Sequence, residues 1–562
     1  NPNNSIVMDV LANDNFVNTS DIVLTIETKP DSGEVVINED NTLQYTPGSE
    51  ATDSFVYDVE TGTEDEAVTQ QGTVTVNVVD TGSIILDKIK AFPSASGHGV
   101  DKVSGGKGGK IFYVTNLDDN NGGSYNKTTG IHSGSFKYAL NHPDAGYIIF
   151  RVSGVIYLND ELKISGADKG DKTVLGGTAP FPGIIVYGDT FRLSKTNGNF
   201  IIRGITFLGG NKMVEAVDDT FSSDFTERLI LSDNTFGWGA DEAYSITTSN
   251  YFTVQRNLAI EGEPDHNVGS IFSTNFNKQE SQSGSAHDNA YIHIKHRFPN
   301  AQGLSNHYID IVNQFAFNYG SRLESHKLPL NVNDVNNYYK KGPRSSSRVG
   351  KKWNADDLGS EFWKPLPKIF SSGNIISDSF TDPLADNKSL WTQHTTSKGF
   401  ISGHTLPTNF FTNEMHLLGL DIHIKSALDT YNYNIVNKNV GSRYVMNSRG
   451  ERIKYFHPFI ESYLNDAIGG KDNAFLDKQS RFVLPKIPNS ELPYKDSDLD
   501  GMADEWEVLH GLNVGERDHE SVKDIWQIDG STFINNAKFT NMQIFNDYVH
   551  GGFLTLISET IY

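Results

Sequence analysis

Short apolar runs recur along the middle of the chain, spaced by roughly 20 to 30 residues. Several end at an asparagine, as at Asn234, Asn257 and Asn313. The runs include Tyr147–Val152, Asn199–Arg203, Arg228–Leu231, Tyr251–Val254, Ala290–Ile294 and Tyr308–Val312. One apolar strand per repeat with an Asn at a corner is how a solenoid of parallel strands buries its core. A β-sandwich would not give such near-continuous apolar runs. The pattern therefore predicts a mainly β, parallel solenoid.

Residues 1–82 have a different pattern, in which apolar and polar residues alternate between closely spaced turn signals. The alternating runs are Ile22–Ile26, Glu34–Ile37, Leu43–Tyr45, Ser54–Tyr57 and Val74–Val78. Such runs are typical of a small β-sandwich. This segment resembles the immunoglobulin- or cadherin-like modules of bacterial surface proteins, which implies a spacer without chemistry.

The remaining residues divide into two further predicted domains. Residues 83–410 contain the repeated runs and form the predicted solenoid. Residues 411–562 are mixed, with helix-like segments at Asn413–Leu420 and Asp504–His510, and we expect them to cap the solenoid.

Charge and composition limit the partners. The net charge of −23 argues against nucleic acid, because binding to phosphates needs a basic surface. An acidic polysaccharide remains compatible, since a local basic cleft or bound cations can offset the excess of carboxylates. No apolar run approaches the length of a membrane span. The chain has no cysteine, which suits an exported protein with a large core as well as a cytosolic one.

A series of motifs follows in order along the predicted solenoid. They are Gly105–Lys110, Gly134–Leu140, Phe150–Ile156, Gly176–Pro180, Ile201–Phe207, Ser232–Glu242, Val254–Asn257, His287–Asn289 and His296–Pro299. In this order the chain resembles the pectate-lyase superfamily, in the bacterial branch that ends in an Asp-rich calcium loop. The resemblance implies a right-handed parallel β-helix that cleaves uronate polysaccharides by β-elimination. It also implies a secreted or cell-surface bacterial protein, which we expect to be a monomer.

Removal of the weakly acidic C5 proton of a uronate requires that the carboxylate be neutralised and the developing enolate stabilised. Calcium bound by hard oxygen ligands can do both. Asp241 and Glu242 stand where the family places an acidic metal ligand, and Glu261 follows one coil later. Asp233 occupies the family's histidine position, while Ser232 stands where its Asp would be. We expect carboxylates from this set to share a calcium ion.

Arg297, in the motif with Phe298 and Pro299, matches the arginine that similar lyases use as the base. A free guanidinium is a poor base, so this role requires a strongly perturbed site or a second base nearby. Lys295, His296 and His287 are the local candidates. The family carries a second basic residue just after this motif, but this chain has Asn300. The change weakens the case for ordinary pectate as the substrate.

Two further side chains flank the acidic residues in sequence. Tyr244 follows Glu242, and His266 follows Glu261. Either could donate a proton to the leaving sugar oxygen. A tyrosine at such a position is more often a packed strand residue.

The sharpest single motif lies at residues 496–507. Asp496, Asp498 and Asp500 alternate, Gly501 follows, and Glu507 ends the motif, with Asp504 at the ninth position. Alternate carboxylates, a glycine for the sharp turn and a terminal glutamate match a twelve-residue calcium loop. We expect calcium here to stabilise the cap rather than to take part in chemistry.

Alternatives to a pectate-type lyase remain open at the level of the sequence. The lyase substrate could be another acidic polymer, such as alginate or a sulfated algal fucoidan. A glycoside hydrolase on the same β-helix could use Asp233, Asp241 and Glu242 as its acidic residues. A non-catalytic carbohydrate-binding surface protein is the third alternative.

Overall fold

The computed structural model describes residues 5–561 except 9, 12–21, 39, 49–51, 62–67, 78–82, 145, 211–212, 214–217, 265, 276–279, 321, 347–349, 355–365, 395–403 and 474–482. The chain divides into two compact units. One contains residues 1–87, 524–536 and 553–562, and the other contains residues 88–523 and 537–552. These bounds differ from the three predicted domains, because two segments of the predicted cap cluster with the first unit. One of them provides β39 (Ser531–Ile534), which pairs with β38 (Ile525–Ile528) and with β7 (Ser83–Ile85).

The N-terminal residues of the first unit form two small antiparallel sheets. One has the order β1 (Ile6–Met8), β4 (Leu43–Thr46), β3 (Glu34–Ile37), and the other has β2 (Ile22–Thr28), β5 (Thr52–Thr61), β6 (Val68–Asn77). Every second residue of β4 is buried, as its alternating sequence predicts. Leu24, Leu43, Tyr45, Phe55 and Val59 form the core.

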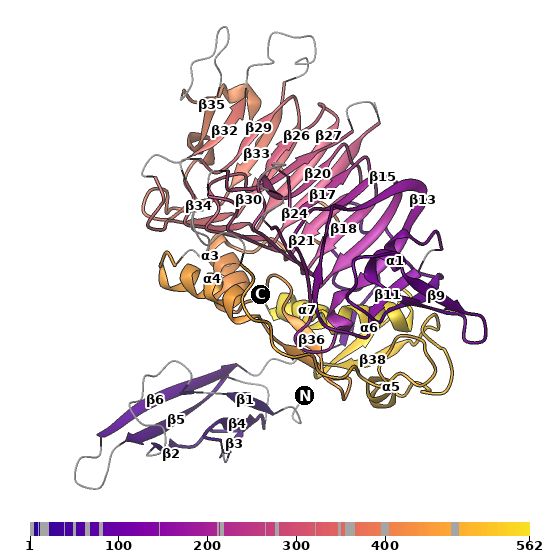
Figure 1. Ribbon diagram of the computed structural model, residues 1–562. Coiled ribbons are helices and arrows are strands. Elements are labelled where there is room, and N and C mark those ends of the chain that lie inside the picture. Colours follow the sequence, from indigo (N-terminus) through magenta and orange to yellow (C-terminus); the bar gives the residue numbers. More distant parts are fainter. Residues whose placement is uncertain are drawn as a thin grey trace. The chain divides into compact units, whose positions relative to one another are not determined.

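The second unit is a parallel β-helix, which confirms the predicted architecture (Figure 1). Successive coils stack strand on strand in three rows. The first row lies in one nine-stranded sheet: β12 (Gly154–Tyr157), β14 (Ile184–Tyr187), β16 (Thr206–Leu208), β19 (Thr235–Gly237), β22 (Leu258–Ile260), β25 (Ala290–Ile292), β28 (Phe315–Phe317), β31 (Tyr338–Lys340) and β34 (Ile375–Ile376).

The second row, which we call the groove row, carries the candidate site. It starts in the first halves of two long strands, β13 (Leu162–Leu175) and β15 (Phe191–Arg203), whose second halves belong to the third row. It continues through β17 (Phe221–Asp224), β20 (Glu242–Thr247), β23 (Val268–Ser273), β26 (Asn300–Gln302), β29 (Ser325–Lys327), β32 (Lys351–Asn354) and β35 (Trp391–His394).

The third row begins at β8 (Lys110–Val114) and β11 (Gly146–Phe150) and passes through the second halves of β13 and β15. It continues with β18 (Leu229–Ser232), β21 (Phe252–Gln255), β24 (Gln282–His287), β27 (His307–Val312), β30 (Asn331–Val335) and β33 (Lys368–Ser372). Inward aliphatic and aromatic side chains of all three rows make one continuous core.

Asparagines at the corner between the third and first rows form a hydrogen-bonded ladder. The backbone N–H of Asn234 donates to Asn257 Oδ1 over 2.9 Å, and that of Asn257 donates to Asn289 Oδ1 over 2.9 Å. The residue before each ladder asparagine has a left-handed backbone, with φ of 60° at Asp233 and 53° at Arg256. The tight corner therefore requires a left-handed backbone conformation, and the asparagine side chains form hydrogen bonds with the buried polar groups of that backbone.

The remaining segments of the second unit cover the β-helix. Helix α4 (Pro458–Gly469) packs its buried side chains on the outer face of the nine-stranded sheet. Helices α5 (Asp504–Leu509) and α6 (Asn541–Val549) lie in the predicted cap. The predicted helix at Asp504–His510 is thus confirmed. The one at Asn413–Leu420 is wrong: the segment is irregular, because its backbone bonds to the solenoid, with His416 N–H donating to Asn333 Oδ1 over 2.9 Å. Among the described helices, none is long and apolar enough to cross a membrane.

Candidate active site

Three carboxylates meet at the start of two neighbouring strands of the groove row. Asp219 precedes β17, Asp241 precedes β20, and Glu242 begins β20. One carboxylate oxygen of each lies within 4.8 Å of the others. The pairing of Phe221 with Tyr244 places Asp219 beside Glu242 on adjacent coils. The N–H of Glu242 donates to Asp219 Oδ1 over 3.0 Å, and the Ser245 hydroxyl donates to Oδ2. Asp219 is a site residue that the sequence analysis missed.

The acidic cluster suits a divalent cation. Burial raises the pKa of Asp219 to about 7, and the nearby Asp241 carboxylate adds to the effect, against the hydrogen bond from Ser245. Calcium prefers several oxygen ligands, and three neighbouring carboxylates offer them. A cation there would remove the cost of keeping them ionised together. Asp219, Asp241 and Glu242 are therefore the residues of this cluster that would hold calcium.

Arg297 faces this cluster from the next part of the groove row. Its Nη1 donates to the Glu242 carboxylate and lies 3.5 Å from Asp241 Oδ1. The backbone of Arg297 is left-handed, with φ of 74°, at the turn that leads into β26. Burial lowers the pKa of Arg297 from its ordinary value, and the charges of Asp241 and Asp219 partly oppose that shift.

His266 completes the group of predicted residues that the structure brings together. Its Nδ1 lies 3.2 Å from Asp241 Oδ1, and 44% of its side chain is exposed. A substrate in the groove could therefore reach this imidazole. The site thus combines three carboxylates, a partly buried guanidinium and an accessible histidine.

Beyond Arg297, cationic side chains continue along the groove row. A hollow of about 240 Å³ is lined by Arg297, Asn300, Arg322 and Lys327 among others. Arg322 has no carboxylate partner among the described residues; its Nη2 lies 3.3 Å from His296 Nδ1. Burial lowers the pKa of Arg322 and that of Lys352 beside it. In a chain with a net charge of −23, such a cluster favours an anionic ligand.

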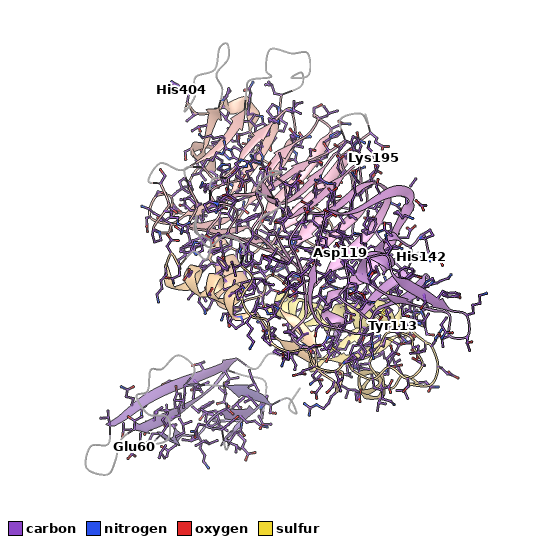
Figure 2. All side chains as sticks on the ribbon, in the orientation of Figure 1. Glu60, Tyr113, Asp119, His142, Lys195 and His404 are labelled. Atoms are coloured by element: carbon purple, nitrogen blue, oxygen red, sulfur yellow. The ribbon has the colours of Figure 1, made fainter. Side chains whose placement is uncertain are left out.

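Another hollow lies on the opposite side of the acidic cluster, at β13 and β15. Its volume is about 560 Å³, and Arg192, Lys195 and Asp224 are among the residues that line it. Lys195 is labelled in Figure 2. Arg192 pairs with Glu161 and lies 3.2 Å from Asp218 Oδ1. The acidic cluster thus has a polar hollow on either side along the groove row, as an extended polymer would need.

Two predicted metal ligands lie away from this cluster. Glu261 follows β22 of the nine-stranded sheet, and its carboxylate accepts a hydrogen bond of 2.7 Å from the Tyr463 hydroxyl of α4. Asp233 is the left-handed corner residue of its coil and is only 2% exposed. Arg256 and Arg443 bind its Oδ1 over 3.1 and 2.7 Å. Its paired, buried carboxylate joins the cap to the solenoid.

The other predicted catalytic residues also take different places. Tyr244 is fully buried, and its hydroxyl lies 2.7 Å from that of Tyr291 inside the solenoid. His287 is 1% exposed, with Nδ1 2.8 Å from Asp288 Oδ2. The ammonium of Lys295 donates to the carbonyl of Pro264 over 2.6 Å. Of the predicted proton donors, only His266 contacts the acidic cluster among the described residues.

The C-terminal loop gathers a second set of carboxylates. Carboxylate oxygens of Asp496, Asp498 and Asp500, one from each residue, lie within 4.8 Å of one another. Asp500 also forms a second group of the same kind with Glu507 and Asp518. Asp518 lies outside the motif, so the spacing did not reveal it. The predicted ligand Asp504 instead accepts from the backbone and hydroxyl of Ser497, each over 2.7 Å.

The loop has the properties of a cation site. Both carboxylate oxygens of Glu507 are buried, and neither has a hydrogen-bond partner in the described parts of the chain. Burial, aided by the charge of Asp500, raises the pKa of Glu507 to about 9, and burial raises that of Asp500 to about 8. Buried carboxylates are rarely left unpaired unless they bind a metal. The donor set therefore fits calcium.

Comparisons with known proteins agree with this architecture. Residues 1–79 match the family model for a bacterial Ig domain. A protein of Emericella nidulans named "Probable pectate lyase C" is 26% identical over 79% of this chain and 90% of its own length. One of the same name from Aspergillus terreus is 30% identical over 46% of this chain and 55% of its own.

Among solved structures, pectate lyase II from Xanthomonas campestris is 14% identical, with a TM-score of 0.37, over 62% of this chain and 98% of its own. These similarities support a polysaccharide lyase related to the pectate lyases, with an immunoglobulin-like module at its N-terminal end.

Proposed function

We propose that this protein cleaves a pectate-like uronate polysaccharide by β-elimination, with calcium held by Asp219, Asp241 and Glu242. The observation that carries the proposal is the contact of the Arg297 guanidinium with Glu242 and Asp241. This contact supports the proposal, because it is made by a cationic side chain next to the proposed calcium ligands. When bound, calcium would supply positive charge to neutralise the uronate carboxylate and to stabilise the developing enolate.

The side chains around the cluster have separate parts in this reaction. Arg297, after it has lost a proton to solvent, takes the C5 proton; burial lowers its pKa and so favours the neutral form that this step needs. His266, which is 44% exposed beside Asp241, gives a proton to the oxygen of the leaving sugar. The C5–H bond breaks, its electron pair forms the C4–C5 double bond, and the C4–O bond to the leaving sugar breaks. The products are an unsaturated uronate and a new sugar hydroxyl.

The cations beyond Arg297 support an anionic substrate. Arg322 and Lys327 belong to the coil of β29 and Lys352 to the next coil, past Asn300, the position where the family's second basic residue is missing. We propose that they bind the acidic groups of sugars next to the cleaved bond. A pectate-like polymer is the first choice because the relatives named above are pectate lyases. Alginate and sulfated fucoidan are the alternatives.

We further propose that a second calcium binds the loop at residues 496–507, with Asp518 as an added ligand, and stabilises the fold. The Tyr113 hydroxyl of β8 donates to Asp496 (Tyr113 is labelled in Figure 2). A Cβ at Gly501 would lie 3.2 Å from Ile149 of β11. A metal in this loop would therefore fix the cap to the first coils of the β-helix. A polymeric substrate and two calcium sites suit work outside the cell, where we expect this enzyme to act.

A screen of purified protein tests the proposal. Polygalacturonate, alginate and fucoidan are each incubated with calcium and with chelator, while the absorbance of unsaturated uronate is recorded. We expect an increase with polygalacturonate that requires calcium. New reducing ends without that absorbance would instead indicate hydrolysis, and neither signal with any polymer would contradict the proposed lyase activity.

A further inference from the structure

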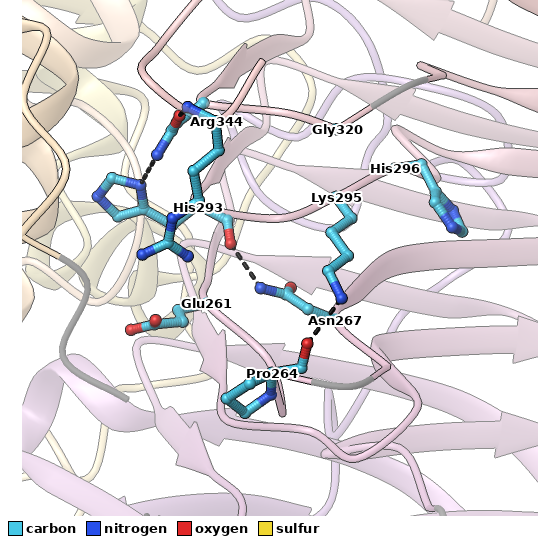
Figure 3. Close-up of a pocket in the computed structure, with 9 residues that line it drawn as sticks. Glu261, Pro264, Asn267, His293, Lys295, His296, Gly320 and Arg344 are labelled. Carbon is cyan, nitrogen blue, oxygen red and sulfur yellow. Dashed lines mark hydrogen bonds between the residues drawn. The ribbon is translucent and has the colours of Figure 1, made fainter. Parts of the chain in front are cut away.

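A second pocket lies beside the candidate active site, in the loops that follow the strands of the nine-stranded sheet (Figure 3). We call it the lateral pocket; its volume is about 380 Å³. Glu261 follows β22, Lys295 and His296 follow β25, and Gly320 follows β28. Arg344 closes one side, and Figure 3 shows its guanidinium above Glu261. The pocket is thus built from successive coils rather than from one mobile loop.

The charges of the lateral pocket favour an anion near its opening. Arg344 donates through Nε to Asp472 over 2.7 Å, and its two terminal nitrogens make no hydrogen bond to a described residue. About 47% of this side chain is exposed, whereas Glu261 is 1% exposed. Lys295 adds a second cation. A ligand would therefore meet cations first and the Glu261 carboxylate, a hydrogen-bond acceptor, at greater depth.

Residues that line the lateral pocket adjoin residues of the candidate active site. His296 lines the pocket, while its ring nitrogens face Arg322 of the groove row. Pro264 and Asn267 line the pocket on either side of His266, which contacts Asp241. Lys295 and His296 directly precede Arg297 in the chain. A group attached to a sugar at Arg297 would thus be within reach of the pocket.

We propose that the lateral pocket is a subsite for an anionic sugar branch of the polysaccharide whose main chain lies in the groove row. The inference rests on the proposed function and adds a substrate feature to it. A volume of 380 Å³ is in the range of small-molecule sites, which is about 300 Å³ or more. Arg344 binds the carboxylate or sulfate of the branch, since a guanidinium matches either group. Glu261 accepts hydrogen bonds from its hydroxyls.

A binding experiment tests the subsite without turnover. Sodium glucuronate and galactose 6-sulfate are titrated separately into the full chain at constant ionic strength and followed by ligand-observed NMR. We expect the Arg344→Gln variant to bind one of them about tenfold more weakly, and Arg344→Lys to recover part of the loss. The sugar affected identifies a carboxylate or a sulfate branch. Equal binding by wild type and Arg344→Gln, or no binding of either sugar, would overturn the inference.

A kinetic experiment separates the inference from the proposed function. Polygalacturonate that carries branches of the sugar identified by the binding experiment is compared with the same backbone without branches. We expect wild type to have the higher kcat/KM on the branched polymer, and Arg344→Gln to lower the branched-to-linear ratio about tenfold. Arg449→Gln, at a residue 74% exposed, serves as the control. If Arg344→Gln has the same branched-to-linear ratio of kcat/KM as wild type, the subsite is rejected. If neither polymer gives an unsaturated product, the proposed lyase activity is rejected, and the binding experiment alone then decides on the subsite.

Discussion

The guanidinium of Arg297 donates to the carboxylate of Glu242, although 55 positions separate the two residues in sequence. The contact exists because Glu242 begins β20 and Arg297 stands two coils later, at the turn into β26. Stacking of parallel strands about 4.8 Å apart brings such residues together. The β-helix thus builds one chemical site from consecutive coils, and this arrangement gives the first prediction.

The substitution Arg297→Lys should lower kcat on the preferred polymer by at least about hundredfold, the usual share of a positioned base. Lysine keeps a positive charge near Glu242, so the loss would reflect the role of the guanidinium rather than the loss of charge alone. Initial rates with calcium measure the effect, and thermal unfolding checks the fold. The exposed Arg449→Gln variant is the control. A variant with near wild-type kcat would remove Arg297 from the mechanism.

The substitution Asp219→Asn should raise the calcium concentration needed for half-maximal activity by about tenfold or more, because it removes a charged ligand at nearly constant shape. Activity measured against buffered free calcium gives this value. Asp168→Asn, at an exposed carboxylate paired with Lys169, is a matched control. If both variants have the same calcium dependence as wild type, Asp219 does not bind the metal.

The substitution Glu507→Gln should lower the free energy of unfolding by about 2–3 kcal/mol at calcium concentrations that saturate the wild-type loop. The reason is that the buried carboxylate of Glu507 would lose the cation that satisfies it. Thermal unfolding with calcium and with chelator measures the effect: chelator should destabilise wild type but change Glu507→Gln little.

Asp518→Asn should behave like Glu507→Gln, because Asp518 joins the same cluster. Asp504→Asn should keep the response to chelator, since the Asp504 carboxylate binds Ser497 instead. An equal response to chelator in wild type and Glu507→Gln would show that calcium stabilises the protein elsewhere.

The contribution of His457 to the stability of the second unit should fall as the pH decreases from about 6.5 to about 4. Burial lowers the pKa of His457 from 6.5 to about 4, so within this range the unfolded chain binds a proton that the folded chain does not. The stabilisation is complete above pH 6.5 and is lost on the way down to the folded pKa, with up to about 3 kcal/mol at stake for one such group.

Urea unfolding at several pH values measures this dependence. His457→Gln should have a shallower decrease in stability between pH 6.5 and 4, while a variant at the exposed His404 serves as the control. Identical pH profiles for wild type and His457→Gln would contradict the assignment.

Much of the fold could be predicted from the sequence, because each coil repeats the same requirements. Apolar runs such as Arg228–Leu231 must face a common core, and an asparagine such as Asn234 must satisfy the corner. Because the apolar runs and the corner asparagines recur in coil after coil, the pattern predicts the fold clearly. The segment Asn413–Leu420 had no such repetition. Its conformation depends on bonds to distant residues such as Asn333, which its own pattern does not contain.

The candidate site was only partly predictable. Asp241 and Glu242 meet Arg297, but Glu261 follows a strand of the nine-stranded sheet and points toward α4. The spacing in the sequence predicts which coil contains Glu261, but it does not predict on which of the three rows of that coil the residue lies. Asp219 could have been found from register: it precedes Phe221 by two residues, as Glu242 precedes Tyr244, and these two aromatics pair.

The left-handed corners and their asparagine ladder have a consequence for how this architecture can change. Each corner is closed by backbone geometry and by asparagines that bond only to the two adjacent coils, as Asn234 does to Asn257 and to the carbonyl of Ile202. A complete coil could therefore be duplicated or deleted without rewriting its neighbours. The groove row could therefore become longer or shorter in evolution by whole coils, and the length of polymer that it can bind would change with it.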